Sequence, residues 1–578
     1  MSALSRLHRL SWLAIGAMAV VLMLPNLAWL WSNHALSTWL YALAVPAALI
    51  VGWFALFGTR LWLGCLSLLP FCVLAPIEAF YIVRYGHPST AEVLATVFVT
   101  NTQEVLQFLG NGLWPLVLAT VVCLAVPSIA VALCFKSHLQ WNQRGREWIV
   151  MAVFALPACF FLLGATTQTT PTMTAYQSGV AALQVLETPL PKGYPFGVID
   201  RVVQFSVQWS AMYSTVKALN SFRFHASRVG HTRTRQIYVL VIGESSRRNH
   251  WQMFGYERPT NPELSEESNL VLIPHMLTSW PETITAAPLI LTRKPITSMD
   301  ATWKEASILR AMQEAGFETW WISNQFPIGQ FDSPISAYSF EAEHVLYVNQ
   351  GDVESSGNYD QDLLMPLRKA IGFDKRDQFI VLHMMGSHLA YDLRYPPEFE
   401  RFRPTFSDHS SSAVSSERIR NSYDNTILYT DHVLAQTVDI LRNSAAITTL
   451  WYESDHGETL PTPTCPKAGH GFGTKYDFQI PAFFWYSDGY ANAFPHRLAA
   501  LRANAVRRTL SANTFESLID MAGVTFPSHD ETWSLFSTHW HYRPRIVNPI
   551  WQVDFDKAAF GKNCEIVLPP DVDPSINQ

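Results

Sequence analysis

The segment VLVIGESSRRNHWQMFGYERPTNPEL, residues 239–264, changes from an apolar run to polar residues at a single glycine. The apolar residues before Gly243 are typical of a buried strand. Glu244, Ser245 and Ser246 follow directly. A serine nucleophile at an elbow turn needs the pattern Gly-x-Ser-x-Gly, and here the second glycine is missing. We therefore expect both serines to cap the next helix, and we interpret Glu244 as a metal ligand.

Short β-branched or aromatic runs alternate with helical segments from about Arg235 onward. Such alternation predicts an α/β domain with a largely parallel sheet. The predicted strands are QIYVLVIG (236–243), ETWWIS (318–323), QFIVLHMM (378–385), AITTLWYES (446–454) and IPAFFWYS (480–487). The predicted helices include DATWKEASILRAMQEAGF (300–317) and IRNSYDNTILYTDHVLAQTVDILRNS (419–444).

Polar residues follow four of these strands at their carboxyl ends. They are Glu244, Asn324, His388 and the pair Asp455–His456. Ligands of open α/β sheets bind outside the carboxyl ends of the strands, so we expect these side chains to meet at one edge. Carboxylates and imidazole suit Zn²⁺, with Mn²⁺ as an alternative. Any one such residue alone is more often a cap or a turn residue, but the set predicts a metal site.

The N-terminal part of the chain is strongly apolar. Charged residues make up only 15% of the 578 residues, against about 25% in ordinary soluble domains, and the shortage lies before residue 166. A helix needs roughly 20 apolar residues to cross a bilayer. Five runs meet this length: Ser11–Trp31, Leu36–Phe57, Leu61–Val83, Leu113–Phe135 and Trp148–Ala165.

Basic residues near these runs predict the orientation in the membrane. They all fall on one side, which is then cytoplasmic: Arg6, Arg9, Arg60, Lys136, Arg144 and Arg146. Five spans place the rest of the chain outside, which in a bacterium is the periplasm. We expect a transmembrane domain at 1–165, with an amphipathic outside loop at 84–111, an interfacial linker with a helix at 166–232 and a catalytic domain at 233–578. The alternative for the linker helix is that it packs on the soluble core.

Two further features limit the function classes. The net charge of −6 and the lack of a basic patch with interleaved aromatics argue against a nucleic-acid partner, and the sequence identifies no protein partner. Only Cys465 and Cys564 lie in the exported part. Two cysteines in an oxidising compartment could pair, but their number alone does not settle it.

Several motifs together resemble the membrane-bound phosphoethanolamine transferases of the alkaline phosphatase and sulfatase superfamily, over nearly the whole chain. The motifs are GESSRRNHWQMFGYERPTNPEL, HMMGSHLAYDLRYP, YDNTILYTDHVL, ESDHGE and TNTQEVLQFL. Details such as WISNQ, LRYP and RIVNP…VDFD are most similar to the branch that modifies the lipopolysaccharide core heptose. The resemblance implies five spans followed by a periplasmic zinc domain.

The resemblance also implies roles for single residues. The family uses a threonine nucleophile downstream of the glutamate, and TSWPETITAAPLILTRKP offers Thr283 and Thr285. Spacing to Glu244 and to Pro288 favours Thr283. The implied zinc ligands are Glu244, Thr283, Asp455 and His456. His388 and His470 would hold the transferred phosphate or a second metal, and Asn324 would also reach the phosphate.

The implied reaction moves phosphoethanolamine from phosphatidylethanolamine to lipopolysaccharide through a covalent intermediate on Thr283. Core heptose phosphate is the first candidate acceptor, lipid A phosphate the second and periplasmic glucan the third. A phosphoglycerol transferase or a sulfatase-like hydrolase of the same superfamily is an alternative enzyme. A catalytically silent membrane scaffold is the alternative of another class. In the family, cysteines flank the nucleophile, whereas residues 279–292 contain none.

Overall fold

The structure, a computed structural model, describes residues 3–32, 39–85, 88–91, 93–94, 113–143, 145–155, 193–230, 232–298, 300–328, 333–349, 359–406, 415–548 and 552–572. The chain forms two compact units, Met1–Val207 and Gln208–Gln578. Helix α11 (Phe196–Leu219) extends across that boundary, inside the expected linker.

The first unit is built on three long helices: α1 (Ala3–Ser32), α4 (Leu61–Tyr85) and α7 (Leu113–Ser137). They share a buried core that includes Met18, Leu68 and Ala130, while apolar side chains such as Leu118 remain 66% exposed. Such a surface suits lipid better than water. Three stretches in the described part are long and apolar enough to cross a membrane: Leu4–Trp31, Gly58–Val83 and Leu113–Ser137.

The other two expected spans are not established. The second corresponds to η1 (Leu40–Ala44) and α3 (Val45–Leu56), and its apolar helix Ala42–Leu56 is short for a full crossing. The fifth begins as α8 (Gly145–Val150) and η4 (Met151–Ala155); its remainder, 156–165, lies outside the described residues. The expected amphipathic loop at 84–111 also lies largely outside them.

The second unit is organised around a seven-stranded sheet in the order β3-β9-β8-β2-β7-β5-β6. The pairings from β8 to β6 are parallel, and both pairings of β9 are antiparallel, so the sheet is mixed. The strands are β2 (Gln236–Gly243), β3 (Leu270–Leu272), β5 (Glu318–Ser323), β6 (His344–Tyr347), β7 (Gln378–His383), β8 (Ile447–Ser454) and β9 (Ala482–Tyr486).

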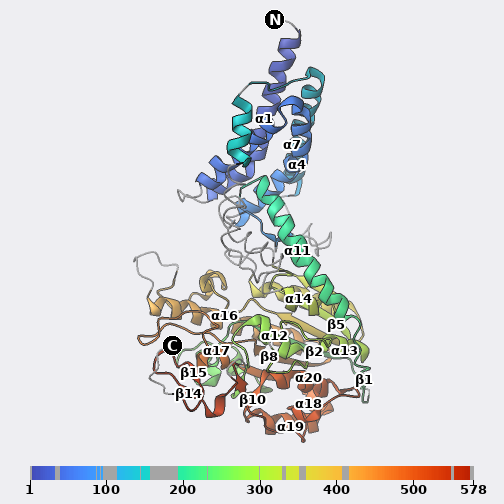
Figure 1. Ribbon diagram of the computed structural model, residues 1–578. Coiled ribbons are helices and arrows are strands. Elements are labelled where there is room, and N and C mark those ends of the chain that lie inside the picture. Colours follow the sequence, from blue (N-terminus) through green and yellow to red (C-terminus); the bar gives the residue numbers. More distant parts are fainter. Residues whose placement is uncertain are drawn as a thin grey trace, which may run out of the picture. The chain divides into compact units, whose positions relative to one another are not determined.

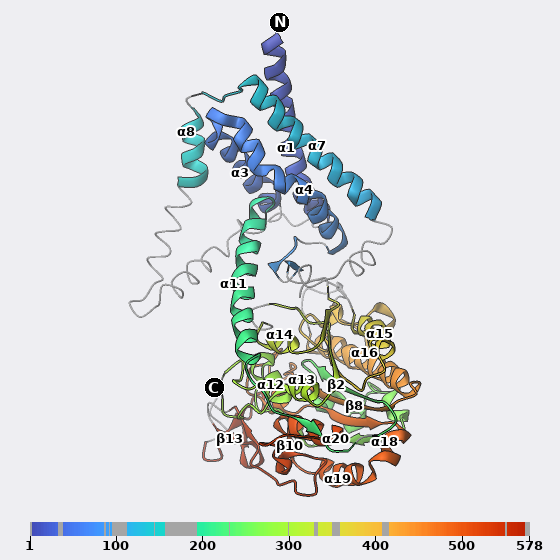
Figure 2. The same cartoon turned by 90° about the vertical axis from the view of Figure 1, so that its right-hand side faces the viewer.

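Helices cover both faces of this sheet (Figures 1 and 2). Successive side chains of a strand point to opposite faces. Val239 and Val241 of β2 therefore share a core with Leu434 and Val438 on one face, while Tyr238 packs against Phe317 and Tyr490 on the other. One layer holds α15 (Leu364–Phe373) and α16 (Ser416–Arg442). The other holds α12 (Thr283–Leu291), α13 (Ile308–Glu314), α18 (Asp488–Ala493) and α20 (Thr514–Ala522).

The sequence predictions for this unit agree with the structure to within a few residues, except for one helix. β2, β5 and the long helix α16 are confirmed. The helix predicted over 300–317 forms only at α13, because Ser307 caps its start by accepting from the backbone N–H of Leu309. Further helices are α14 (Ser333–Ser339), α17 (Lys475–Phe478) and α19 (Pro495–Ala505). Four two-stranded sheets are also present in the described part of the chain. They pair β1 (Ser227–Arg228) with β11 (Val524–Thr525), β4 (Met276–Leu277) with β10 (Thr509–Leu510), β12 (Ile546–Val547) with β13 (Val553–Asp554), and β14 (Ala559–Phe560) with β15 (Val567–Leu568).

Two features lie away from the strand ends. Cys465 and Cys564 form a disulfide across 99 residues of sequence, which settles the pairing that the sequence left open.

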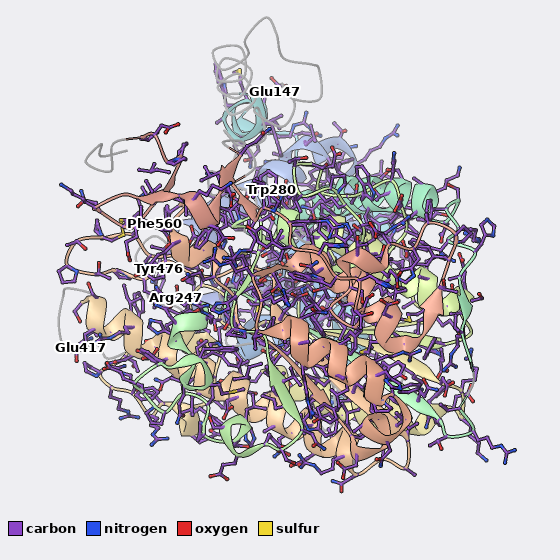
Figure 3. All side chains as sticks on the ribbon, turned by 90° about the horizontal axis from the view of Figure 1, so that it is seen from below. Glu147, Arg247, Trp280, Glu417, Tyr476 and Phe560 are labelled. Carbon is purple, nitrogen blue, oxygen red and sulfur yellow. A yellow bond between two sulfur atoms is a disulfide. The ribbon has the colours of Figure 1, made fainter. Side chains whose placement is uncertain are left out.

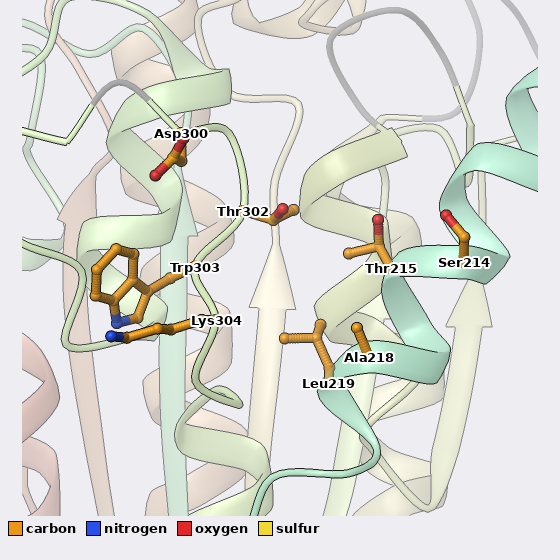
Figure 4. Close-up of a pocket in the computed structure, with 8 residues that line it drawn as sticks. All are labelled: Ser214, Thr215, Ala218, Leu219, Asp300, Thr302, Trp303 and Lys304. Atoms are coloured by element: carbon orange, nitrogen blue, oxygen red, sulfur yellow. The ribbon is translucent and has the colours of Figure 1, made fainter.

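A pocket of about 480 Å³ lies between the C-terminal part of α11, from Ser214 to Leu219, and segment 300–304 (Figure 4). None of the predicted site residues lines it.

Candidate active site

Glu244, Asp455 and His456 meet because their strands are neighbours in register. Gly243 at the end of β2 pairs with Ser454 at the end of β8, and the N–H of Asp455 continues the ladder by donating to the carbonyl of Gly243 at 3.1 Å. All three side chains are buried, at 1%, 0% and 0% exposure. Their ligand atoms lie within 4.8 Å of one another, as expected from the sequence.

Thr283 reaches this trio from a helix and not from the end of a strand. It is the first residue of α12, and its Oγ1 lies 3.2 and 3.3 Å from the two carboxylate oxygens of Glu244. The same atom lies 3.0 Å from Nε2 of His456. Thr285, the alternative, instead donates to the carbonyl of Glu282 at 3.2 Å. Of the two threonine hydroxyls, the structure brings that of Thr283 to the cluster.

The spacing of these atoms fits a tetrahedral metal ion. Bonds of about 2.0–2.2 Å to zinc place its ligand atoms roughly 3.3–3.6 Å apart. Nε2 of His456 lies 3.3 Å from Oε1 of Glu244 and 3.5 Å from Oδ2 of Asp455. These distances between ligand atoms, and those from Oγ1 of Thr283, all fall close to that range. These four residues could therefore hold one zinc ion.

Two further observations support the fit. Nδ1 of His456 lies 2.8 Å from the carbonyl of Gly457, and because a carbonyl only accepts, Nδ1 must carry the proton. The lone pair of Nε2 is then available to the cluster, an arrangement typical of histidine ligands. Oδ2 of Asp455 is buried and has no hydrogen-bond donor among the described residues. Burying such an unpaired oxygen costs free energy unless a cation is bound beside it.

The electrostatics of the cluster also call for a cation. Burial, together with the carboxylate of Glu244, raises the pKa of Asp455 to about 7. Burial opposes charge on His456, but the two carboxylates outweigh it and raise its pKa to about 10, so they favour a positive charge at Nε2, either a proton or a metal ion in its place. Burial likewise opposes the ionisation of Glu244, yet hydrogen bonding and charge from His456 hold its pKa below the usual range. Two buried carboxylates therefore produce a strong negative potential.

A tight loop after β7 brings His388 to the same edge. The N–H of Ser387 donates to the carbonyl of Glu244 at 2.9 Å. Gly386 adopts φ +51, and a Cβ there would lie 2.8 Å from the carbonyl oxygen of Glu244, so the close approach needs glycine. Burial lowers the pKa of His388 to about 4, and its buried Nδ1 has no partner in the described part of the chain.

Asp360 holds this loop in place. Its carboxylate accepts from the N–H groups of Met385 and Gly386 at 2.8 and 2.9 Å and from Nδ2 of Asn324 at 2.9 Å. The buried amide of Asn324 therefore binds an acid that supports the His388 loop. Its neighbour Gln325 extends to the cluster, with Nε2 3.4 Å from Oε2 of Glu244.

His470 lies beside His456, with ring centroids 4.3 Å apart. Its Nδ1 bonds Oε2 of Glu458 at 3.1 Å, and Tyr391 donates to the other oxygen of Glu458 at 2.5 Å. The guanidinium of Arg247 donates to the backbone carbonyl of Glu458 at 3.2 Å. Arg247 in turn lies over the ring of Tyr476, 3.8 Å from its centroid (Figure 3).

The sequence prediction was wrong about the two serines and missed several contributors. Ser245 donates to Oε1 of Glu244 at 2.6 Å, and Ser246 accepts from the indole of Trp251 at 2.8 Å, so neither caps a helix. The residues not assigned to the site are Ser245, Gln325, Asp360 and Glu458. The motif ESDHGE contained a signal for Glu458, since its acid lies two residues after His456. Gln325 and Ser245 left no comparable signal.

Fold and site together define the class of protein. The sulfatase family model matches residues 236–524, half of the chain, and the chain belongs to that family. Within it, the chain is similar to phosphoethanolamine transferases. It is 26% identical to phosphoethanolamine transferase EptC of Escherichia coli K12 over 526 residues, which are 88% of this chain and 87% of that protein. It is 25% identical to phosphoethanolamine transferase CptA of Salmonella typhimurium over 528 residues, with the same shares.

A solved structure supports the same relationship. The crystal structure of the C-terminal periplasmic domain of EptC from Escherichia coli, in complex with Zn, matches with a TM-score of 0.53 and 27% identity. The match covers 59% of this chain and 98% of that domain. The expected resemblance to the phosphoethanolamine transferases is therefore confirmed.

Proposed function

We propose that this protein transfers phosphoethanolamine from phosphatidylethanolamine to a lipopolysaccharide acceptor, with Thr283 as the nucleophile. The observation that carries the proposal is the position of the Thr283 hydroxyl, 3.0 Å from His456 and 3.2 Å from Glu244. A threonine hydroxyl held among metal-ligating side chains is suited to become a nucleophile. The similarity to EptC over 88% of the chain supports the choice of donor.

Zinc would be held by Glu244, Asp455, His456 and the hydroxyl of Thr283, and when bound it would lower the pKa of that hydroxyl and stabilise negative charge. The Zn complex of the related EptC domain supports this assignment. One ion is expected here; His388 and His470 are the candidates for a second. The protein's own residues set the geometry: Gly457 fixes the tautomer of His456, and Ser245 and Gln325 orient the carboxylate of Glu244.

In the first step, Oγ1 of Thr283 attacks the phosphorus of phosphatidylethanolamine. The bond from phosphorus to the glycerol oxygen breaks, diacylglycerol leaves, and the proton lost by Thr283 ends on the glycerol oxygen. His388, uncharged near pH 7 because burial lowers its pKa to about 4, and His470, held by Glu458, would orient the phosphoryl oxygens. In the second step, an acceptor oxygen attacks phosphorus, the bond from phosphorus to Oγ1 of Thr283 breaks, and the proton lost by the acceptor ends on Oγ1 of Thr283. Covalent catalysis thereby divides one difficult step into two.

The acceptor and the location are part of the proposal. Core heptose phosphate is the first candidate and lipid A phosphate the second, because WISNQ, LRYP and RIVNP resemble the core-modifying branch. The apolar helices of the first unit would anchor the protein in the bacterial inner membrane with the second unit in the periplasm. Both substrates are lipids, which accounts for a membrane-anchored enzyme.

The test uses the full chain in detergent and phosphatidylethanolamine with a fluorescent acyl chain. We expect labelled diacylglycerol to form, and a chelator to abolish its release until zinc is added back. A mass increment of phosphoethanolamine on the peptide that contains Thr283 should appear when no acceptor is present. If no diacylglycerol forms with zinc-loaded protein, phosphatidylethanolamine is not the donor and the proposal fails.

A further inference from the structure

Glu282 directly precedes the proposed nucleophile, and its carboxylate is exposed. Its backbone is fixed by the helix start, because its carbonyl accepts from the N–H groups of Thr285 and Ala286 at 3.2 and 2.9 Å. The side chain caps nothing, and glutamate is not among the residues favoured at this position. Within the described part of the chain, its carboxylate has no hydrogen-bond or ion-pair partner.

The carboxylate lies against the loop that carries His470. A Cβ added at Gly471 would approach Oε1 of Glu282 to 3.0 Å, so that oxygen is close to the backbone one residue after His470. Glu282 is thus next to Thr283 in sequence and close in space to Gly471, the residue after His470. If a phosphoryl group were attached to Thr283 and oriented by His470, the carboxylate of Glu282 would lie beside it.

The charge of this carboxylate is opposite to what a phosphate requires. The zinc ion that the cluster would hold, together with the histidines, would suit an anionic phosphoryl group, whereas an unpaired carboxylate beside them would repel it. A substrate with a cation next to its phosphate would offset that repulsion. The ammonium of ethanolamine lies roughly 4–5 Å from phosphorus, through four bonds of about 1.5 Å, which a glutamate adjacent to the nucleophile can span.

We propose that Glu282 binds the ammonium of the transferred headgroup and makes the site select phospholipids whose headgroup carries a cation next to the phosphate. This inference rests on the proposed function and adds a specificity residue to it. The carboxylate would act on the bound donor and on the covalent intermediate alike, because the ethanolamine stays attached to phosphorus in both.

The test compares two donor lipids in mixed micelles, phosphatidylethanolamine and phosphatidylglycerol, by release of labelled diacylglycerol from the full-length protein. Glu282→Gln should lower kcat/KM for phosphatidylethanolamine about two- to fivefold, mostly through KM. Turnover of phosphatidylglycerol should fall much less, so the preference between the lipids narrows. Glu282→Asp should recover part of the preference. The matched control is Glu417→Gln, a change at an exposed glutamate in the first turn of α16 (Figure 3).

The outcomes separate this inference from the reaction itself. If the parent protein releases no diacylglycerol from phosphatidylethanolamine, the proposed function fails. If the parent is active and Glu282→Gln leaves the ratio of the two lipids unchanged, only the ammonium site is overturned. An equal loss with both lipids would assign Glu282 a structural role and would also overturn it. Zinc content and thermal midpoint, measured on each variant, should match the parent.

Discussion

Oγ1 of Thr283 lies 3.0 Å from Nε2 of His456, although 173 residues separate them in the chain. The contact joins the start of a helix to the end of a strand. It also distinguishes Thr283 from Thr285, whose hydroxyl bonds the carbonyl of Glu282 within the first turn of the same helix. The proposed chemistry depends on this juxtaposition.

Thr283→Ala should reduce diacylglycerol release at least about a thousandfold, because the covalent route loses its nucleophile. Thr285→Ala, the matched control two residues along, should keep more than about a third of the parent rate. Thr283→Ser should retain measurable activity, since it keeps the hydroxyl. Full activity of Thr283→Ala would move the nucleophile elsewhere, with Ser245 as the first candidate.

Asp455→Asn should lower the affinity for zinc by more than about a hundredfold, because it replaces a buried carboxylate ligand by a neutral amide, and even the loss of an outer partner costs about ten- to a hundredfold. The zinc content of the purified protein, measured by inductively coupled plasma mass spectrometry, tests this prediction directly. Asp439→Asn, at a partly exposed position on α16, is the control and should retain the zinc of the parent. Equal zinc in Asp455→Asn would contradict the assigned ligand set.

Asp360→Asn should slow turnover about tenfold while the zinc content stays unchanged. The asparagine has one acceptor oxygen in place of the two that hold Met385, Gly386 and Asn324, and the loop that carries His388 loses its support. Asp362→Asn, on the same turn but exposed, is the control. A loss of zinc together with activity would indicate a general collapse of the site and not a specific effect on His388.

Glu341 should make stability depend on pH. Burial raises its pKa from 4.5 to about 7, and one of its oxygens accepts from the N–H and the hydroxyl of Ser307, each at 2.8 Å. The folded state therefore binds the proton more tightly than the unfolded state. The protonated Glu341 therefore contributes roughly 3 kcal/mol to the free energy of unfolding below pH 4.5, and this contribution is lost as the pH rises to about 7.

The variant Glu341→Gln should remove this slope. Thermal midpoints of parent and variant, measured by tryptophan fluorescence in detergent between pH 4.5 and 8, should diverge as the pH rises, with the variant becoming relatively more stable. Glu417→Gln, which changes an exposed side chain, should follow the parent. A constant difference between Glu341→Gln and the parent across the range would show that Glu341 titrates normally.

The disulfide between Cys465 and Cys564 should stabilise the second unit by about 4–5 kcal/mol, as the chain-entropy model gives for closing a loop of 99 residues. The double variant Cys465→Ser/Cys564→Ser should therefore unfold at a lower temperature, and a reducing agent should have the same effect on the parent. Cys123→Ser, at a free cysteine of the first unit, is the control. An unchanged midpoint in the double variant would refute a stabilising bond.

The sequence by itself determined the strands and the trio at their ends. β2 and β5 form where the pattern placed them, because a central strand that is covered on both faces needs a continuous apolar run. Glu244, Asp455 and His456 follow such runs directly, and parallel neighbours bring their carboxyl ends to one edge. These properties are local to each strand, so the order of residues suffices to read them.

Only the tertiary structure decided which other side chains complete the site. The family resemblance already favoured Thr283 over Thr285, but only the structure places its hydroxyl beside Glu244 and His456. The roles of Gln325 and Ser245 depend on side-chain directions in loops. The pairing of Cys465 with Cys564 likewise joins two segments 99 residues apart. Contacts between such segments are set by packing across the whole unit, and no periodicity along the chain encodes them.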